Sequence, residues 1–239
     1  MKYKYFRQGM QDGIPIALGY FAVSFTFGMA AVTGGLTVWE AVLISMTNLT
    51  SAGQFAGLGI ILAMGSYWEM AMTQLIINLR YCLMSFSLSQ KLEKEGSPLH
   101  RFLVAFGMTD EIFAVSSAQI GKVSPYYNYG AMSMAVPGWI LGTLAGAILG
   151  NVLPDSVTNA LSVAIYGMFL AIIIPPAKKD SAVMKVVIAA MVVSTLFAIV
   201  PVLNRVSGGF VIIITTVPVA GSAAYLFPIK EQEATSHGA

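Results

Sequence analysis

The amino-acid sequence predicts an all-α integral membrane protein. Of its 239 residues, 56% are hydrophobic and 10% are charged, whereas charged residues make up about 25% of an ordinary soluble protein. The mean hydropathy is +0.75. Long apolar runs follow one another along nearly the whole chain, separated by short connectors. A soluble domain with so few polar residues could not cover its own surface, so we expect a single transmembrane domain over residues 1–239.

The apolar runs predict about seven or eight hydrophobic segments. A membrane-spanning helix needs about 20 mainly apolar residues. Runs of this kind lie roughly at 13–33, 38–64, 67–90, 102–120, 129–151, 157–176, 181–201 and 208–227.

The first run follows Lys2, Lys4 and Arg7 and so imitates a secretory signal peptide. It is longer than the apolar core of a signal peptide, and a second apolar run follows it at once. We therefore expect a retained first helix over 13–33.

The connectors and interruptions set the limits of the later elements. Between Thr47 and Gly53 the run 38–64 contains Thr, Asn, Ser and Gly, so we expect a broken helix there. In 129–151 glycine recurs at every fourth position from Gly138, a spacing typical of closely packed helices. The other runs end at turn-forming or polar stretches: Gly34-Gly35, Gly65-Ser66, 91–101, Ser124-Pro125, Pro154-Asp155, 175–180 and Ser207-Gly208.

Lysine and arginine gather in three places, which the positive-inside rule assigns to the cytoplasm. The clusters are Lys2, Lys4 and Arg7; Lys91, Lys94 and Arg101; and Lys178, Lys179 and Lys185. If every run crossed once, the second cluster would lie outside. The conflict disappears if 38–64 is a re-entrant hairpin, which enters and returns on the same side.

A similar hairpin over 157–176, broken near Tyr166-Gly167, would return the third cluster to the cytoplasm. Residues 1–120 and 129–227 would then be two inverted repeats, each with a helix, a re-entrant hairpin and two further helices. Inverted repeats whose broken helices meet near the membrane midplane are a recurrent plan of transporters. The competing interpretation is eight plain crossings with an exceptional charge distribution.

Polar residues inside the apolar runs are the candidate functional residues, because a charge at membrane depth costs roughly 2.5–3.5 kcal/mol on insertion scales. Arg80 lies in the middle of 67–90. Its permanent charge and planar fork suit a carboxylate, either of a substrate or of Asp110 or Glu111. The alternative is an arginine that extends to the interface. Asn78 points to a different helix face and could form hydrogen bonds with backbone groups that a broken helix nearby leaves unpaired.

Asp110 and Glu111 are adjacent, so on a helix they diverge by about 100° and cannot both face one ligand. One could pair with Arg80 while the other titrates as a proton carrier. A purely structural ion pair is the alternative. No nucleophile–base set and no Walker-type phosphate loop accompany them, so we expect neither an enzyme nor an ATPase. No metal site or other cofactor is expected, since neither histidine has companion ligands.

The interrupted part of 38–64 is a second candidate region. Its small and polar residues could form an unwound segment whose amides and carbonyls bind a zwitterion. Small-residue helix packing is the alternative, although packing does not require a glutamine. The candidate substrate-binding residues here are Asn48, Ser51, Gly53 and Gln54.

Five motifs stand in order along the chain: Asp12-Gly13-Ile14-Pro15, Phe27-Gly28, Ala52-Gly53-Gln54-Phe55-Ala56, Asn78-Leu79-Arg80-Tyr81 with Leu83-Met84, and Asp110-Glu111 with Phe113-Ala114. Together they resemble the AzlC family, the large subunit of bacterial branched-chain amino-acid exporters. The family commonly has Phe-Ala-Gly-Ser-Ala-Gln-Phe where this chain has 49–55, and often a histidine where this chain has Tyr81.

The resemblance implies export of hydrophobic neutral amino acids such as leucine, isoleucine and valine, together with a small, hydrophobic, AzlD-like membrane subunit. The site residues that it implies are Gln54, Asn78, Arg80, Asp110 and Glu111.

We therefore expect a multi-pass, proton-coupled secondary transporter in the cytoplasmic (inner) membrane of a prokaryote. Two alternatives remain: an uncoupled channel for small polar solutes, in which Arg80 is a selectivity charge, and a non-catalytic membrane assembly subunit. With a net charge of only +2, the chain lacks the excess of basic residues that is typical of nucleic-acid-binding proteins, so we expect no nucleic-acid partner.

Overall fold

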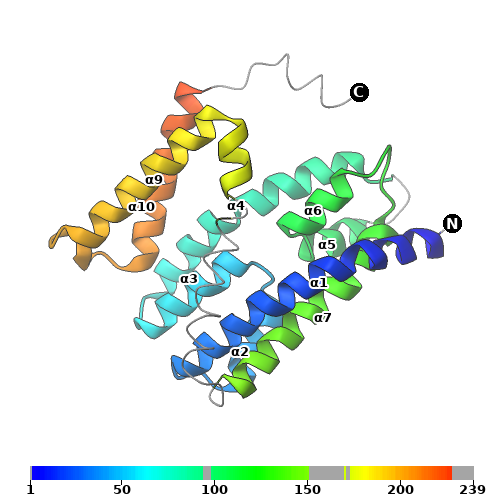
Figure 1. Ribbon diagram of the computed structural model, residues 1–239, viewed down its shortest axis with the longest axis horizontal. Coiled ribbons are helices and arrows are strands. Elements are labelled where there is room, and N and C mark those ends of the chain that lie inside the picture. The colour runs from blue at the N-terminus through cyan, green and yellow to red at the C-terminus, as the bar shows by residue number, and fades with distance from the viewer. Residues whose placement is uncertain (1, 94–97, 151–169, 171–172, 228–239) are drawn as a thin grey trace.

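A computed structural model describes residues 2–93, 98–150, 170 and 173–227, which form a helical protein (Figure 1). Within this part of the chain, the only β pairing is an isolated bridge between Leu92 and Val123. The all-α prediction is confirmed, whereas the predicted number of segments is not. The elements are α1 (Lys2–Thr33), α2 (Val38–Thr47), α3 (Ser51–Leu62), α4 (Tyr67–Lys91), α5 (Pro98–Phe106), α6 (Asp110–Ser117), α7 (Pro125–Leu149), α9 (Ser181–Ile199), η1 (Leu203–Arg205) and α10 (Gly208–Leu226).

The described helices fall into two length classes. By length and apolar composition, α1, α7, α9 and α10 can each cross a hydrocarbon layer about 30 Å thick. α4 has 25 residues and is roughly 37 Å long at 1.5 Å per residue, although its polar residues lower its hydropathy. α2, α3, α5 and α6 have 12 residues or fewer and are too short to cross. These short helices form two broken hairpins.

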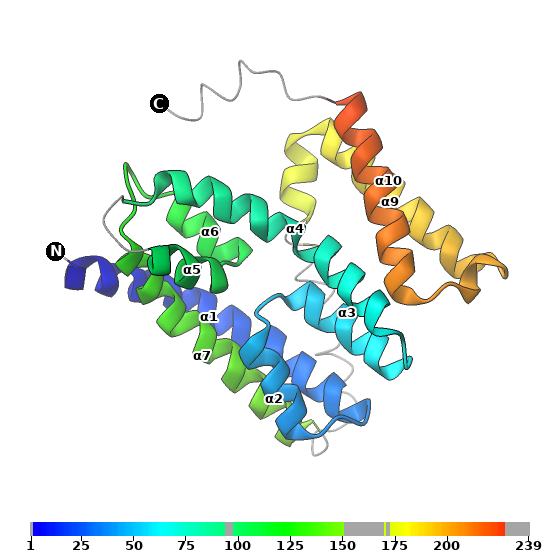
Figure 2. The same cartoon turned by 180° about the vertical axis from the view of Figure 1, so that it is seen from behind.

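α1 lies beside α7 along the length of α7, as both views show (Figures 1 and 2). Gly9 faces Tyr127 near the start of α7, and Gly28 faces Ala147 near its end, so the two helices are parallel. A Cβ at Gly138 would lie only 2.7 Å from the backbone oxygen of Ala17, so a side chain there would force the helices apart. The predicted packing role of the glycines at every fourth position is confirmed.

The predicted break in 38–64 is confirmed. α2 ends at Thr47 and α3 begins at Ser51, and the Thr50 side chain accepts a hydrogen bond from the Gly53 amide of the new helix, at 3.2 Å. Leu62 at the end of α3 lies beside Gly34, just before α2. The chain therefore returns to the end at which α2 began, as the re-entrant hairpin requires.

The predicted single helix over 102–120 is wrong, because α5 and α6 form a second broken hairpin. Thr109 adopts an extended backbone, with φ −130° and ψ 169°, and caps α6 through the Ile112 amide at 3.3 Å. The chain returns to the end where α4 stops, since the Val123 amide donates to the Lys91 carbonyl at 2.9 Å. This hairpin enters from the opposite end of the molecule to the first.

The second hairpin has a consequence for the repeat scheme. Because α5 and α6 do not cross, α7 starts at the same end as α1 and runs parallel to it. In the predicted inverted repeat, 129–151 would run in the opposite direction to 13–33. The parallel arrangement of α1 and α7 does not fit this pairing, so an inverted repeat would have to match other elements to each other. The other predicted hairpin, over 157–176 with its break near Tyr166-Gly167, lies mostly outside the described residues. The single-domain organisation and an internal repeat stay predictions.

α10 runs in the same direction as α4. Its first turn lies at Glu69 near the start of α4, where the Gly209 amide donates to the carboxylate at 3.1 Å. Seven residues later, Thr216 lines a cavity together with Ile76 and Ile77. The ends of α4 and α10 therefore point to the same side of the molecule.

Each of the three basic clusters has a described member at this side. The Lys2 ammonium lies 5.1 Å from the ring centre of Tyr126, and that ring is 5.9 Å from the ring of His100, next to Arg101. Lys185 lies 5.1 Å from the ring of Phe227, at the end of α10. This arrangement is the one that the positive-inside rule predicts for a cytoplasmic side, so we expect this side to face the cytoplasm.

The topology can be tested by cysteine labelling in a Cys82→Ala background, since Cys82 is the only cysteine. Ile120, in the loop after α6, and Tyr67, at the start of α4, are almost completely exposed. We expect an impermeant maleimide to label Ile120→Cys only from the cytoplasmic side and Tyr67→Cys only from outside. Labelling of both positions from one side would contradict the two opposed hairpins.

Candidate functional site

The two broken hairpins bring the N-termini of α3 and α6 to the middle of α4. A cavity of about 380 Å³ lies at this meeting point. We call it the central cavity. Its lining combines polar groups of α1, α3, α4, α6 and α7 with apolar side chains, and it includes Tyr20, Ser51, Arg80, Asp110, Glu111 and Trp139.

Arg80 pairs with Asp110. The Arg80 Nη1 atom lies 2.8 Å from Asp110 Oδ2, and Nη2 donates to the Tyr81 hydroxyl at 3.1 Å. The two side chains of the ion pair remain 41% and 30% exposed, respectively, so the pair borders the cavity instead of being sealed in the protein. Asp110 and Glu111 were both predicted as possible partners of Arg80, and Asp110 is the one that forms the ion pair.

Glu111 has a different environment. Its Oε2 atom accepts a hydrogen bond from the Tyr20 hydroxyl at 2.5 Å. The Tyr20 ring in turn packs edge-on against Trp139, with ring centres 5.3 Å apart. Among the described residues, Arg80–Asp110 is the only ion pair, so Glu111 has no cationic partner there. The two adjacent carboxylates therefore diverge to different partners, as their sequence separation predicts.

Gln54 lies behind the cavity wall and not in it, since only 1% of the residue is exposed. Its Oε1 atom accepts from Trp139 Nε1 at 2.7 Å, and its Nε2 atom donates to Ser45 Oγ at 2.8 Å. Ser45 is in turn hydrogen-bonded to Thr143 at 2.7 Å. This buried network fixes the indole ring that lines the cavity, so Gln54 positions Trp139.

Gly53 also lies outside the cavity and allows α3 to approach α4. Its carbonyl accepts a hydrogen bond from Gln74 Nε2 at 2.8 Å, and a Cβ at Gly53 would lie 2.8 Å from the Gln74 Oε1 atom. Asn78 donates to the same Oε1 atom at 3.1 Å, while its own Oδ1 atom is buried without a partner.

Asn48 and Asn78 line a smaller cavity of about 170 Å³ beside the central one. We call it the middle cavity. Asn48 Oδ1 accepts from the Thr50 amide at 3.1 Å and so stabilises the break between α2 and α3. The structure thus brings Ser51, Arg80, Asp110 and Glu111 to one cavity, places Asn48 and Asn78 at a neighbouring one, and puts Gly53 and Gln54 behind the wall.

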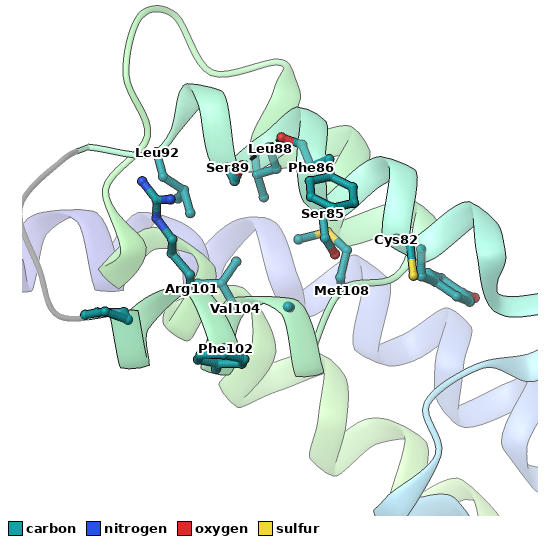
Figure 3. Close-up of a pocket in the computed structure, with 13 residues that line it drawn as sticks. Cys82, Ser85, Phe86, Leu88, Ser89, Leu92, Arg101, Phe102, Val104 and Met108 are labelled. Atoms are coloured by element: carbon teal, nitrogen blue, oxygen red, sulfur yellow. Dashed lines mark hydrogen bonds between the residues drawn. The ribbon is translucent and has the colours of Figure 1, made fainter. Parts of the chain in front are cut away.

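A larger and mainly apolar cavity of about 540 Å³ lies between α4 and α5 (Figure 3). We call it the outer cavity. Phe86, Leu88, Phe102 and Val104 supply much of its wall, and Arg101 projects beside it. It lacks the ion pair and paired carboxylates of the central cavity, which is therefore our candidate binding site.

Four site residues were not predicted from the sequence: Tyr20, Gln74, Tyr81 and Trp139. Three of them are aromatic, and isolated aromatic residues are ordinary in membrane helices. For Tyr81 the signal is its place in the motif Asn78-Leu79-Arg80-Tyr81. For Tyr20 and Trp139 the signal is that Gly19-Tyr20 and Gly138-Trp139 repeat the same glycine–aromatic pair, in two helices that pack closely.

Comparison with known proteins gives a family match over residues 15–153 to the model described as "AzlC protein". An "Uncharacterized membrane protein" of Archaeoglobus fulgidus is 36% identical over 175 residues, which cover 72% of this chain and 76% of that protein. The "Inner membrane protein YgaZ" of Escherichia coli is 28% identical over 203 residues, 81% of this chain and 83% of that protein. No solved structure matches the chain.

Proposed function

Because this chain belongs to the AzlC protein family, we propose that it is a secondary transporter that exports branched-chain or other hydrophobic neutral amino acids. Its membrane is the cytoplasmic (inner) membrane of a prokaryote, a location supported by the name of the related Escherichia coli protein. The family and the apolar helices establish a membrane protein; the substrate, the direction and the coupling are our proposal.

The observation that carries the proposal is the meeting of two opposed, broken hairpins at a cavity that contains fixed charges. Broken helices that place their N-termini at a central site are typical of secondary transporters. The N-terminus of α3 at Ser51 carries partial positive charge, which together with Arg80 favours a carboxylate. A volume of about 380 Å³ is within the usual range for small-molecule sites, roughly 300–1,000 Å³.

The rest of an amino acid also finds suitable groups in the central cavity. Asp110 and Glu111 offer oxygen atoms to an ammonium group. Leu49, Ile76 and Ile77 supply apolar surface for an aliphatic side chain. The lining therefore suits a small zwitterion with a hydrophobic side chain better than a sugar or a nucleotide, which would need many more hydrogen-bonding groups.

Proton coupling is proposed to reside in Glu111. Asp110 is already paired with the permanent charge of Arg80, whereas Glu111 is held by a phenol hydroxyl. A carboxyl group without a cationic partner can gain and lose a proton without breaking an ion pair. A small, hydrophobic, AzlD-like subunit is proposed as the partner on the basis of the family resemblance. α9, which buries none of its residues within the described chain, offers it an apolar surface.

The test is efflux from vesicles that contain this chain together with its AzlD-like subunit and are preloaded with labelled leucine, valine or methionine. We expect faster efflux than from protein-free vesicles, accumulation against a gradient when a proton gradient is imposed, and no acceleration for labelled glutamate. An uncoupled channel would equilibrate its solute without accumulation. Efflux equal to that of protein-free vesicles for all three amino acids would contradict the proposal.

A further inference from the structure

The three cavities are connected by shared lining residues. The central and middle cavities share Leu49 and Tyr81. The middle and outer cavities share Tyr81, Ala105 and Met108. Among the cavities described above, only Tyr81 lines all three, so its side chain lies where the central cavity meets the space that leads away from it.

The outer cavity extends from this junction to the cytoplasmic end of α4. Tyr81, Ser85 and Leu88 follow one another at intervals of four and three residues, a spacing that places them on one face of α4. Leu92 follows directly after the helix, and all four line the outer cavity. Leu92 and Arg101 lie at one end of it, while Cys82 and Met108 lie toward the other (Figure 3). Leu92 is buried, whereas Arg101 is exposed, so the cavity opens beside Arg101. Because α4 ends on the side that we expect to be cytoplasmic, this mouth faces the cytoplasm.

The ring of Tyr81 is held in place by the binding site itself. Its hydroxyl accepts the hydrogen bond from Arg80 Nη2, and the Arg80 guanidinium carbon lies 4.8 Å from the centre of its ring. The other terminal nitrogen of the guanidinium, Nη1, is paired with Asp110. A ligand carboxylate that binds Arg80 would compete for the donor that holds Tyr81, so occupation of the site would loosen this ring.

We propose that the outer cavity is the cytoplasmic vestibule of the transport route and that Tyr81 is the gate between this vestibule and the central cavity. The ligand that passes is a small zwitterion with an apolar side chain, an identity that rests on the function proposed above. The apolar walls of the vestibule suit the side chain, and Arg101 at its mouth suits the carboxylate.

The native Cys82 tests whether water fills the vestibule. It is the only cysteine and it lines the outer cavity, so the unmodified chain can be used in complex with its subunit. In inside-out vesicles we expect a water-soluble, impermeant maleimide to label Cys82. If only a membrane-permeant maleimide reacts, the groove is filled by lipid and the proposal is overturned.

The gate is tested with a cysteine behind it. Ser51→Cys, in a Cys82→Ala background, places a thiol in the central cavity. We expect slow labelling of this thiol from the cytoplasmic side. Adding Tyr81→Ala should raise the labelling rate about tenfold, because loss of one net hydrogen bond changes a rate by about this factor. Phe86→Ala is the matched control, because Phe86 lines the outer cavity but not the other two. Equal rates for Tyr81→Ala and its parent would overturn the gate.

A reversal experiment separates an opened gate from a loosened fold. Ala105 of α5 lines both the outer and the middle cavities, as Tyr81 of α4 does. Adding Ala105→Trp to Tyr81→Ala is expected to restore slow labelling of Ser51→Cys, because the indole refills the passage. Labelling that stays fast would mean general loosening and would overturn the route. These readouts do not depend on transport, so a chain that fails to export amino acids could still confirm or contradict the gate.

Discussion

Arg80→Lys is expected to lower export at least about tenfold while folded protein reaches the membrane in nearly normal amounts. The guanidinium engages two partners at once, Asp110 through Nη1 and Tyr81 through Nη2. A lysine ammonium keeps the charge but lacks the planar fork that spans both partners. Loss of one hydrogen bond to a charged group corresponds to roughly 1.5–3 kcal/mol, or about 10- to 160-fold in rate.

The matched control is Arg205→Lys, which makes the same replacement at an exposed arginine of η1. Initial efflux rates of labelled leucine, normalised to the amount of folded protein in the vesicles, provide the measurement. The Arg205 variant should transport like the wild type. An Arg80→Lys variant within about twofold of the wild type, a difference below one net hydrogen bond, would mean that Arg80 only anchors its helix.

The first broken hairpin was predictable because two independent signals agreed. Small and polar residues interrupt the run between Thr47 and Gly53, and the basic cluster at Lys91 requires an even number of crossings before it. The structure adds the local cause. The side chains of Asn48 and Thr50 accept hydrogen bonds from the backbone amides of Thr50 and Gly53, which in a continuous helix would donate to backbone carbonyls.

The second broken hairpin was not predicted because its break is short. Gly107 and Thr109 are its only small or turn-forming residues, and single glycines are common in membrane helices. The charged pair Asp110-Glu111 follows at once, but it was interpreted as a functional site and not as the start of a new helix. The signal that was overlooked is Lys122, whose ammonium donates to the Gln90 carbonyl at 2.8 Å on the cytoplasmic side. A single crossing over 102–120 would have placed this lysine outside.

The candidate site was predictable in its charged residues and not in its shape. Arg80, Asp110 and Glu111 are conspicuous because charges are rare inside apolar runs, and all three line the central cavity. Gln54 is conspicuous as a polar amide inside an apolar run, but the sequence could not reveal that its partner is Trp139, 85 positions away along the chain. Contacts between distant helices depend on packing, which no local pattern contains.

Glu111→Gln is expected to abolish accumulation driven by a proton gradient while sparing exchange of amino acid between the two sides of the membrane. The amide keeps nearly the same size and can still accept the hydrogen bond from Tyr20, but it cannot bind and release a proton. Exchange requires only that the loaded carrier changes its orientation. Accumulation requires that proton movement be linked to that change, so the two activities should separate.

Asp110→Asn is expected to give a different phenotype, because it removes the partner of a permanent charge. Breaking a fully buried ion pair costs roughly 3–5 kcal/mol. The Arg80 side chain is 41% exposed, so water can solvate part of its charge and the loss should be smaller. We expect reduced folded yield and slower exchange together, with the remaining transport still coupled to protons.

The comparison of the two amides assigns the roles, since each variant is the control for the other. Counterflow of labelled leucine measures exchange, an imposed proton gradient measures coupled accumulation, and detergent-solubilised monodisperse protein measures folded yield. A coupled Glu111→Gln variant and an uncoupled Asp110→Asn variant would reverse the assignment, and the ion pair would then have to open in each cycle to release its proton. If both amides accumulate leucine at the wild-type level, neither carboxylate carries the proton. Coupling would then have to come from another group, because a carboxamide side chain cannot titrate at any physiological pH.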